Sequence, residues 1–346
     1  MINDVTQRGM SVEAVIPVFN GQETIALAIE SALRQTSPFS RITVVDQCSS
    51  DNTAAITKRY SQVRYVMNAE SRNPSDNWNK AVSLVESDFV CVLHADDILL
   101  PQWNEQCLLL LGKAPDPLAT CLFVGGAEFR FPHELTSILL FADQPRLYGK
   151  GGLLKVLWAR GFYGLRASAN VLYSRRVFER FGGFPAGVFA SMGDVPLHLR
   201  MLAEIPFGYV PSPLLLMRVG EKGRLSLSRR DELARGAFLA LENSADKLAA
   251  AMAKGVSEIK AQYAYPYWVA YLLNRCGLST WAVPADVAEK ALAWVREAGV
   301  VRMGLHTVAC AVEFLRRQWC FRRHRHYTER WLREFLESIP PGKMEK

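Results

Sequence analysis

Strand and helix patterns alternate over the first hundred residues, and this alternation restricts the fold more than any other feature of the sequence. Four short apolar segments predict buried strands, at residues 12–18, 41–45, 63–67 and 89–93. Segments with apolar residues at helical spacing lie between them. Such an alternation is typical of an α/β fold in which a mainly parallel sheet carries helices on both faces.

Polar residues follow each of the four predicted strands. They are Asn20, Asp46, residues 68–73 and residues 94–97. Parallel strands end at the same edge of a sheet, and α/β proteins bind ligands at that edge. For any single loop, ordinary loop polarity explains the pattern equally well. The four clusters together indicate a ligand site.

Asp96 and Asp97 follow the apolar segment 89–93 directly. Carboxylates at the end of a strand can hold a hard divalent cation. Such a cation would bridge diphosphate oxygens and offset the charge of a departing nucleotide. The alternative is that Asp97 caps a helix beginning at Ile98.

Three segments in order give a more specific signal: residues 15–20 (VIPVFN), 44–53 (VVDQCSSDNT) and 93–97 (LHADD). Together they resemble the family-two glycosyltransferases, which have the GT-A fold. Residues 77–81 (NWNKA) are similar to the helix before the metal motif in members that build bacterial surface polysaccharides. The resemblance extends over residues 12–226.

The resemblance implies which residues bind the nucleotide sugar. They are Pro17, Phe19, Asn20, Glu23, Asp46, Asn73, Lys80, His94, Ala95, Asp96 and Arg218. In this family Pro17 and Phe19 would line the nucleoside pocket, and Asp46 would accept a hydrogen bond from the base, typically uracil. The donor is therefore expected to be UDP-linked, although a thymidine nucleotide presents the same edge. Asp96 and Asp97 would hold Mn²⁺ or Mg²⁺, with Asp96 as the main ligand.

His94 stands where many members of the family have the first Asp of an Asp-x-Asp motif. We interpret it as a variant that weakens the case for tight metal binding. A neutral imidazole can still bond ribose or coordinate a metal. Packing against the edge of the sheet is the alternative for this side chain.

Asp194 is the candidate catalytic residue. An inverting transfer needs a base that takes the proton of the acceptor hydroxyl. In the family this base belongs to an acidic pair that opens a short helix, and Gly193 occupies the position where Glu is common. An N-cap is the structural alternative for Asp194. Arg166 and Asn170 match the segment that usually touches the acceptor.

Arg218 follows a predicted strand at 207–218 that contains Pro211 and Pro213, a composition that suits an edge strand. Similar loops in the family place a basic residue over the diphosphate, and Lys222 or Arg224 could serve equally. Helical patterns dominate after residue 226. We therefore predict a GT-A catalytic domain at 1–226 and a helical region at 227–346. The nucleotide-sugar half would cover about 10–105 and the acceptor half 106–226.

The chain of 346 residues has a net charge of +7, which favours acidic partners such as nucleotides or anionic lipid. Its seven scattered cysteines include no CxxC pair and fit a reducing cytoplasm. No signal peptide or membrane-spanning segment is expected. The processive synthases of the family have a Gln-x-x-Arg-Trp motif that is not found here, so we expect transfer of a single sugar.

Residues 314–333 interleave arginines with aromatic residues. Such a helix can lie on anionic lipid, which would place the protein peripherally at the inner face of the cell membrane and near a lipid-linked acceptor. The alternative is a helix whose aromatic residues pack on the catalytic domain while the arginines face water. No nucleic-acid motif accompanies the charge, so no nucleic-acid partner is expected.

The main prediction is therefore an inverting glycosyltransferase acting on a saccharide or lipid-linked acceptor in surface-polysaccharide synthesis. One alternative is a degenerate GT-A binding protein without turnover, which His94 and Gly193 keep open. A sugar-phosphate nucleotidylyltransferase is the other alternative. Its glycine-rich, arginine-containing N-terminal loop is not found, because the sequence around Gly21 offers one glycine.

Overall fold

The computed structural model describes residues 9–71, 73–131, 134–159, 168–185, 194–219, 230–264, 283–298, 319 and 321–339. The strands are β1 (Val12–Val18), β2 (Arg41–Asp46), β3 (Arg64–Met67), β4 (Phe89–Val92), β5 (Ile98–Leu99), β6 (Cys121–Arg130), β7 (Glu134–Leu139), β8 (Arg146–Tyr148), β9 (Val171–Ser174) and β10 (Phe207–Arg218). The α-helices are α2 (Ile25–Leu33), α3 (Thr53–Thr57), α4 (Pro74–Ser83), α5 (Trp103–Leu111), α6 (Gly152–Ala159), α7 (Arg175–Arg180), α8 (Asp194–Glu204), α10 (Arg230–Met252) and α12 (Ala285–Ala298). Two 3₁₀ turns complete the set, η1 (Pro117–Ala119) and η2 (Ser168–Asn170).

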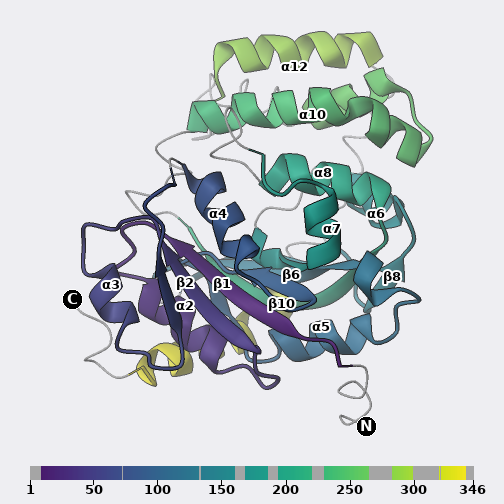
Figure 1. Ribbon diagram of the computed structural model, residues 1–346. Helices are drawn as coiled ribbons and strands as arrows, with labels where there is room; N and C mark the ends of the chain where they lie inside the picture. Colours follow the sequence, from purple (N-terminus) through teal and green to yellow (C-terminus); the bar gives the residue numbers. More distant parts are fainter. Residues whose placement is uncertain are drawn as a thin grey trace.

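The described strands form one ten-stranded sheet in the order β3-β2-β1-β4-β9-β6-β10-β5, with β7 beside β6 and β8 beside β10 (Figure 1). The four strands expected from the first hundred residues are parallel to one another. β1 lies between β2 and β4, and all seven of its residues are buried. From β1 the chain adds β2 and then β3 on one side of β1, and it then crosses to β4 on the other side of β1. Right-handed crossovers therefore place α4 on the face opposite α2 and α3.

The second half of the sheet is mixed, because β9 runs antiparallel to both β4 and β6. The prediction that residues 207–218 form an edge strand is wrong. β10 pairs with β6 along one side and with β8 and β5 along the other. Its register with β6 shifts between Val210 and Leu215, where Pro211 and Pro213 lie. An irregularity in the ladder tolerates proline within a sheet, since the missing N–H leaves no ladder bond broken there.

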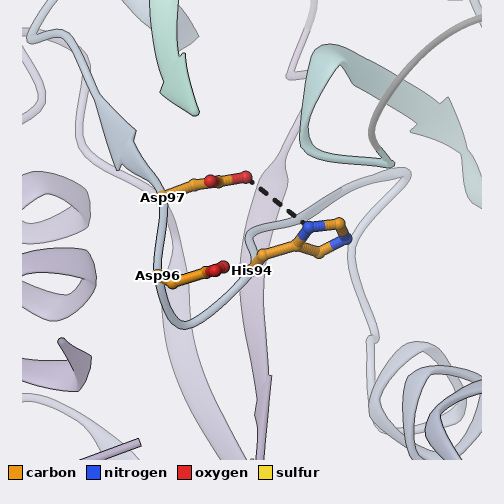
Figure 2. A group of neighbouring side chains, drawn as sticks. All are labelled: His94, Asp96 and Asp97. Atoms are coloured by element: carbon orange, nitrogen blue, oxygen red, sulfur yellow. Dashed lines mark ion pairs between the residues drawn. The ribbon is translucent and has the colours of Figure 1, made fainter. Parts of the chain in front are cut away.

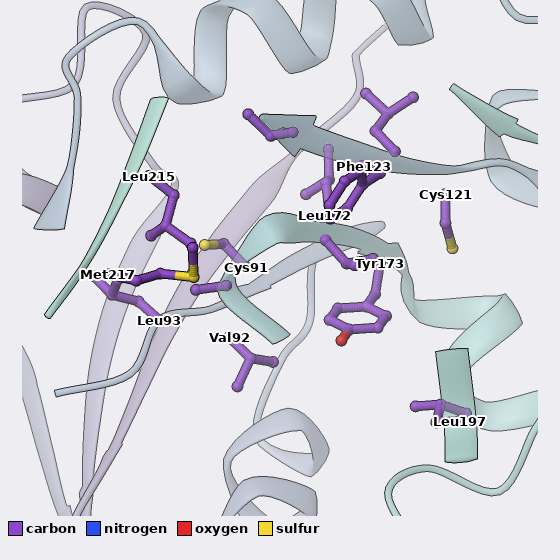
Figure 3. Packing of buried hydrophobic residues seen from close by; sticks show 14 of the residues in the cluster. Cys91, Val92, Leu93, Cys121, Phe123, Leu172, Tyr173, Leu197, Leu215 and Met217 are labelled. Carbon is purple, nitrogen blue, oxygen red and sulfur yellow. The ribbon is translucent and has the colours of Figure 1, made fainter. Parts of the chain in front are cut away.

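The hydrophobic core lies between the sheet and its covering helices, and Figure 3 shows its central part around β4, β6, β9 and β10. Cys91, Cys107 and Cys121 are buried in it as free thiols. Burial raises the pKa of the Cys121 thiol to about 12, although the backbone N–H of Ser174 opposes the shift. These three cysteines therefore act as small apolar core residues.

Helices dominate the later part of the described chain, as expected. α10 packs on α8 and α12 on α10, so that both stack over one side of the sheet (Figure 1). Residues 256–264 and 321–337 are also helical. The predicted boundary at residue 226 falls outside the described residues and stays a prediction. Among the described residues, no helix is both long enough and apolar enough to cross a membrane.

Candidate active site

Hydrogen bonds join the loops that follow β1 and β2. Asn20 adopts a positive φ of 50° and its N–H donates to Ser49 Oγ at 2.8 Å. The side chain of Asn20 accepts in return from the backbone N–H of Ser50 at 2.9 Å. The N–H of Gly21 donates to Thr53 Oγ1 at 2.9 Å. The two loops therefore form one rigid rim at the carboxyl edge of the sheet.

Asp46 ends β2 beneath this rim and is buried. Its Oδ1 accepts from the backbone N–H and the hydroxyl of Ser49, at 2.9 and 2.6 Å. Its Oδ2 accepts from the Tyr65 hydroxyl at 2.8 Å. Burial, together with the hydrogen bond to Asp46 and the negative charge of Asp46, raises the pKa of Tyr65 to about 12. A carboxylate has about four acceptor positions, so Asp46 is fixed in orientation and keeps the capacity to accept another N–H.

Two large apolar side chains are exposed beside Asp46. Phe19, which follows β1, is 60 % exposed, and Met67, which ends β3, is 63 % exposed. Met67 is the register partner of Asp46 in the β2–β3 ladder. Pro17 is buried instead, opposite Val45. Met67 was not predicted as a site residue, because the sequence shows its place at the end of a strand and does not show its exposure.

His94, Asp96 and Asp97 meet at the end of β4 (Figure 2). One ligand atom from each lies within 4.8 Å of the other two. His94 Nδ1 is 3.5 Å from Asp97 Oδ2, and the backbone N–H of Arg218 donates to Asp97 Oδ1 at 3.3 Å. Two carboxylates and one imidazole suit a divalent cation of the Mn²⁺ type, since Mg²⁺ prefers oxygen ligands alone. The residues present therefore fit a metal.

α4 connects this cluster to the loop before α8. The ring of Trp78 stacks on the imidazole of His94 with centroids 5.0 Å apart. It also packs edge-to-face with the ring of Phe184, with centroids 5.3 Å apart. Asn79 donates to the carbonyl of Phe184 at 2.7 Å and accepts from its N–H at 2.9 Å. The motif NWNKA was noted in the sequence, but the partners of Trp78 and Asn79 could not be inferred from it.

Asp194 is buried in the first turn of α8. Tyr173 on β9 and His198, one turn further along α8, share a hydrogen bond of 2.5 Å between Oη and Nε2. Burial raises the pKa of Tyr173 well above its ordinary value, and the negative charge of Asp194 adds to this shift. Asp194 therefore lies close to a hydroxyl that stays neutral across the working pH range. Gly193 and the residues that would test the N-cap interpretation lie outside the described residues.

Arg218 ends β10 on the side of the carboxylate cluster. Its guanidinium lies over the ring of Phe131, 5.7 Å from the centroid. Its Nη2 is 3.8 Å from Oε2 of Glu23, which follows β1. A positive charge therefore faces the site from the second half of the sheet. Lys222 and Arg224 lie outside the described residues.

The remaining predicted residues are more dispersed. Asn73 caps α4 by accepting from the N–H of Asp76 at 3.0 Å, and Lys80 is exposed on the same helix. Ala95 is half-buried between His94 and Asp96. Asn170 is buried and donates to the carbonyl of Val124 at 2.9 Å, which supports β6. Its contact with an acceptor stays a prediction, and Arg166 lies outside the described residues.

Comparison with known proteins identifies the family. Residues 13–182 match the family described as Glycosyl transferase family 2. These residues form a domain of this family, as the motifs implied. The chain is 33 % identical over 89 residues to the succinoglycan biosynthesis protein ExoO of Rhizobium meliloti. This alignment covers 25 % of this chain and 26 % of ExoO. The chain is 29 % identical over 104 residues to an Escherichia coli protein, UDP-Glc:alpha-D-GlcNAc-diphosphoundecaprenol beta-1,3-glucosyltransferase WfgD, covering 30 % of this chain and 41 % of WfgD. The aligned segments thus span under half of these two relatives.

Solved structures of the same architecture confirm the GT-A fold. TarS of S. aureus in complex with UDP-GlcNAc superposes with a TM-score of 0.63 at 14 % identity, over 91 % of this chain and 92 % of that one. The mannosyltransferase PcManGT from Pyrobaculum calidifontis, in complex with GDP-Man and Mn²⁺, gives a TM-score of 0.50 at 17 % identity, over 94 % and 85 % of the two chains. At these identities the likeness concerns the fold and not the ligands.

Proposed function

We propose that this protein transfers a single sugar, with inversion, from a UDP-linked donor to a saccharide or lipid-linked acceptor in surface-polysaccharide synthesis. One observation carries the proposal. The fixed acceptor Asp46 and the cluster of His94, Asp96 and Asp97 end two strands that flank β1. Two strand spacings separate them by about 10 Å, a span that a nucleoside diphosphate can bridge.

The nucleoside would bind on the side of β2. Asp46 is oriented by Ser49 and Tyr65 to accept the imide N–H of uracil. The exposed apolar side chains of Phe19 and Met67 offer surfaces to the base on either side of that acceptor. A base with an N–H donor at this edge is selected, because a base presenting only acceptors there would leave a buried carboxylate facing a lone pair.

The diphosphate would lie over the loop after β4. His94, Asp96 and Asp97 are the residues that would hold a divalent cation, and a bound Mn²⁺ or Mg²⁺ would neutralise the charge of the departing UDP. PcManGT, which has the same fold, is described with Mn²⁺. Arg218 supplies a second positive charge from β10, and its N–H orients Asp97. In this proposal its guanidinium binds an oxygen of the diphosphate.

Asp194 is proposed as the base. Its carboxylate takes the proton of the acceptor hydroxyl while that oxygen forms a bond to the anomeric carbon. The bond from that carbon to the diphosphate oxygen breaks on the opposite side, so the configuration inverts. Tyr173 stays protonated beside it. A neutral neighbour adds no competing negative charge beside Asp194.

For the acceptor, the relative WfgD is named for a sugar on diphosphoundecaprenol, which favours a lipid-linked saccharide for this chain also. Such an acceptor would place the protein in the cytoplasm at the inner face of the membrane. Arg166 and Asn170 remain the proposed acceptor contacts. In this proposal residues 1–226 perform transfer, and α10 covers the acceptor side by packing on α8.

The test is release of UDP from a panel of UDP-sugars by the purified chain, with Mn²⁺, with Mg²⁺ and with a chelator. We expect slow donor hydrolysis that needs a metal, and a raised melting temperature with the accepted donor. Binding without turnover, with any acceptor offered, would favour the degenerate binding protein. Absence of both binding and hydrolysis with every nucleotide sugar would refute the enzyme. Formation of a nucleotide sugar from sugar phosphate and UTP would favour the nucleotidylyltransferase.

A further inference from the structure

Positive charge is concentrated near the C-terminal end of the chain. Residues 319–333 contain five arginines and one glutamate, a net charge of +4, in a protein whose net charge is +7. The other 331 residues together contribute only +3. The basic character of the protein is therefore mostly a property of one short helix and not of the nucleotide-sugar site.

One face of this helix is fixed against the catalytic domain. Thr328, Leu332 and Phe335 are buried, as is Ile339 just beyond the helix. The guanidinium of Arg34, at the end of α2, lies 5.4 Å from the centroid of the Phe335 ring and bonds to Ser338. The apolar face is thus occupied by the protein itself. Deep insertion of this face into a bilayer would require the helix to detach.

The opposite face is exposed and basic. With about 100° of rotation per residue, Trp319, Arg323, His326 and Arg330 lie on one stripe, opposite Thr328, and Arg322 and Arg333 flank it. All six are exposed, and Trp319 is 54 % exposed. Tyr327 borders the same face and is 57 % exposed. Glu329 borders this face beside Arg322 and is paired with Arg325. Glu334 and Glu337 lie at the C-terminal end of the face, so residues 319–333 form its cationic part.

We propose that the exposed face of residues 319–333 binds the surface of an anionic lipid bilayer. Arginines on a juxtaposed surface are attracted to anionic headgroups, and tryptophan and tyrosine favour the boundary between headgroup and hydrocarbon. The choice of a bilayer agrees with the lipid-linked acceptor of the proposed function. Because the apolar face is already buried, attachment is electrostatic and superficial, with the two aromatic side chains as shallow anchors.

Two of the arginines have partners within the helix, and this decides which of them to test. Arg325 bonds to Glu329 at 2.9 Å, and it lies at the side of the helix. Arg330 is 3.7 Å from Glu334, a fully exposed pair of little strength. The guanidinium of Arg323 lies over the ring of Trp319, 5.2 Å from its centroid, and this contact keeps both side chains on the outer face. Arg322, Arg323, Arg330 and Arg333 are therefore the charges most available to a lipid surface.

Co-sedimentation with vesicles, without donor or acceptor, tests this proposal. The wild-type chain should bind vesicles of phosphatidylcholine containing about 30 % phosphatidylglycerol, and not phosphatidylcholine alone. Binding should fall steeply when the salt concentration rises from about 0.1 to 0.5 M. Substituting Arg322, Arg323, Arg330 and Arg333 together by Gln should lower the vesicle partition coefficient more than about tenfold. Trp319→Ala should lower it by a smaller factor.

The matched control removes four exposed charges elsewhere, by substituting Arg64, Lys113, Lys155 and Arg176 with Gln. It should bind vesicles much as the wild type does, and both variants should keep the wild-type melting temperature and donor affinity. Equal loss in the two variants would refute a specific face, as would absence of binding by the wild type. Tighter binding to duplex DNA or RNA than to vesicles at the same salt concentration would assign the face to nucleic acid. Because the assay omits the donor, its failure leaves the proposed transfer unaffected.

Discussion

His94 contacts an aromatic ring and a carboxylate at once. The ring of Trp78 stacks on it, and Asp97 Oδ2 is 3.5 Å from its Nδ1. An Asp at this position would repel Asp97 unless a cation lay between them. The imidazole avoids this repulsion, and it still offers a nitrogen ligand when neutral. Compared with an Asp at this position, His94 therefore gives the site one negative charge fewer and one additional contact, with Trp78 on α4.

Asp194→Asn should abolish transfer. The amide cannot take a proton from the acceptor hydroxyl, so we expect kcat to fall by about 10²- to 10⁴-fold. Donor affinity, measured by calorimetry, should stay near that of the wild type, because Asp46 and the carboxylate cluster are unchanged. Glu204→Gln, at the far end of the same helix, is the control and should keep most activity. Substantial transfer by Asp194→Asn would remove this residue as the base.

The carboxyl group of Asp51 should make the stability of the protein depend on pH. Its carboxylate accepts from Gln22 N–H and from the N–H and hydroxyl of Thr53. Burial alone would raise the pKa of Asp51, but these hydrogen bonds outweigh it and hold the pKa below its ordinary value of 3.8. A lowered folded pKa stabilises the protein above pH 3.8, and this stabilisation is lost as the pH falls below that value.

Asp51→Asn should therefore lower the free energy of unfolding by about 1 kcal/mol at neutral pH, since the group is only partly buried. The difference from the wild type should shrink at about pH 3. Urea titrations at the two pH values measure both quantities. An equal difference at both values would contradict the role of the charged form.

At the scale of elements, α4 connects the two parts of the site. Trp78 contacts His94 after β4, and Asn79 bonds to both backbone groups of Phe184 before α8. Arg200 on α8 donates to the carbonyl of Phe181 at 2.9 Å and so fixes the other end of the same turn. The position of α8, and of Asp194 on it, therefore depends on a turn that α4 supports.

The glycines of this turn provide a matched pair of substitutions. Gly182 and Gly183 have positive φ values of 74° and 70°. A Cβ on Gly182 would meet open space, whereas a Cβ on Gly183 would lie 2.5 Å from Asn79 Oδ1. Gly182→Ala should cost about 1–2 kcal/mol of backbone strain. Gly183→Ala should cost at least about 1 kcal/mol more and also lower kcat, because it displaces Asn79 and the turn before Asp194.

Urea unfolding and steady-state kinetics on the two variants measure these effects. Equal losses of stability would show that the contact with Asn79 adds nothing to the backbone strain. If kcat falls as much for Gly182→Ala as for Gly183→Ala, the contact between this turn and Asn79 does not determine the position of Asp194.

At the scale of the whole molecule, the far end of the chain returns to its beginning. Residues 321–339 pack beside α2, and Arg34 bonds to Ser338 across 304 residues of sequence (Figure 1). α10 and α12 cover α8 at another part of the molecule. The helical region thus contacts both halves of the catalytic domain, so its loss should affect the whole fold.

Leu332→Ala should destabilise the protein by about 2–4 kcal/mol, because this side chain is fully buried between the C-terminal helix and the catalytic domain. Leu336→Ala, on the half-buried side of the same helix, should cost less than half as much. Hydrogen exchange should become faster in α2 for Leu332→Ala. If exchange changes only within the C-terminal helix itself, that helix is not part of the cooperative unit.

Local patterns predicted much of the fold. The four strands of the first half were placed within two residues because their β-branched runs are bounded by polar loops. The helix that contains the NWNKA motif begins before it, at Pro74, because Asn73 caps it and a proline fits the first turn. The prediction that β10 is an edge strand was wrong for a physical reason. A proline lacks the backbone N–H, and both an edge position and a register shift within a sheet tolerate this, so the sequence could not distinguish the two. β9 was not predicted.

The order of the motifs along the chain was enough to identify the family, because a parallel sheet brings the ends of successive strands to one edge whatever the details of packing. Asp46, Asp96 and Asp97 were predicted as site residues in this way, and Asp194 was predicted from the resemblance to the family. Tertiary structure alone decided the surroundings of the site residues: Tyr65 bonds to Asp46, Trp78 stacks on His94, and the hydrogen-bonded pair of Tyr173 and His198 lies near Asp194. It also decided that the basic helix has its apolar face covered. Such contacts join residues far apart in sequence, and their geometry depends on side-chain packing that no local pattern encodes.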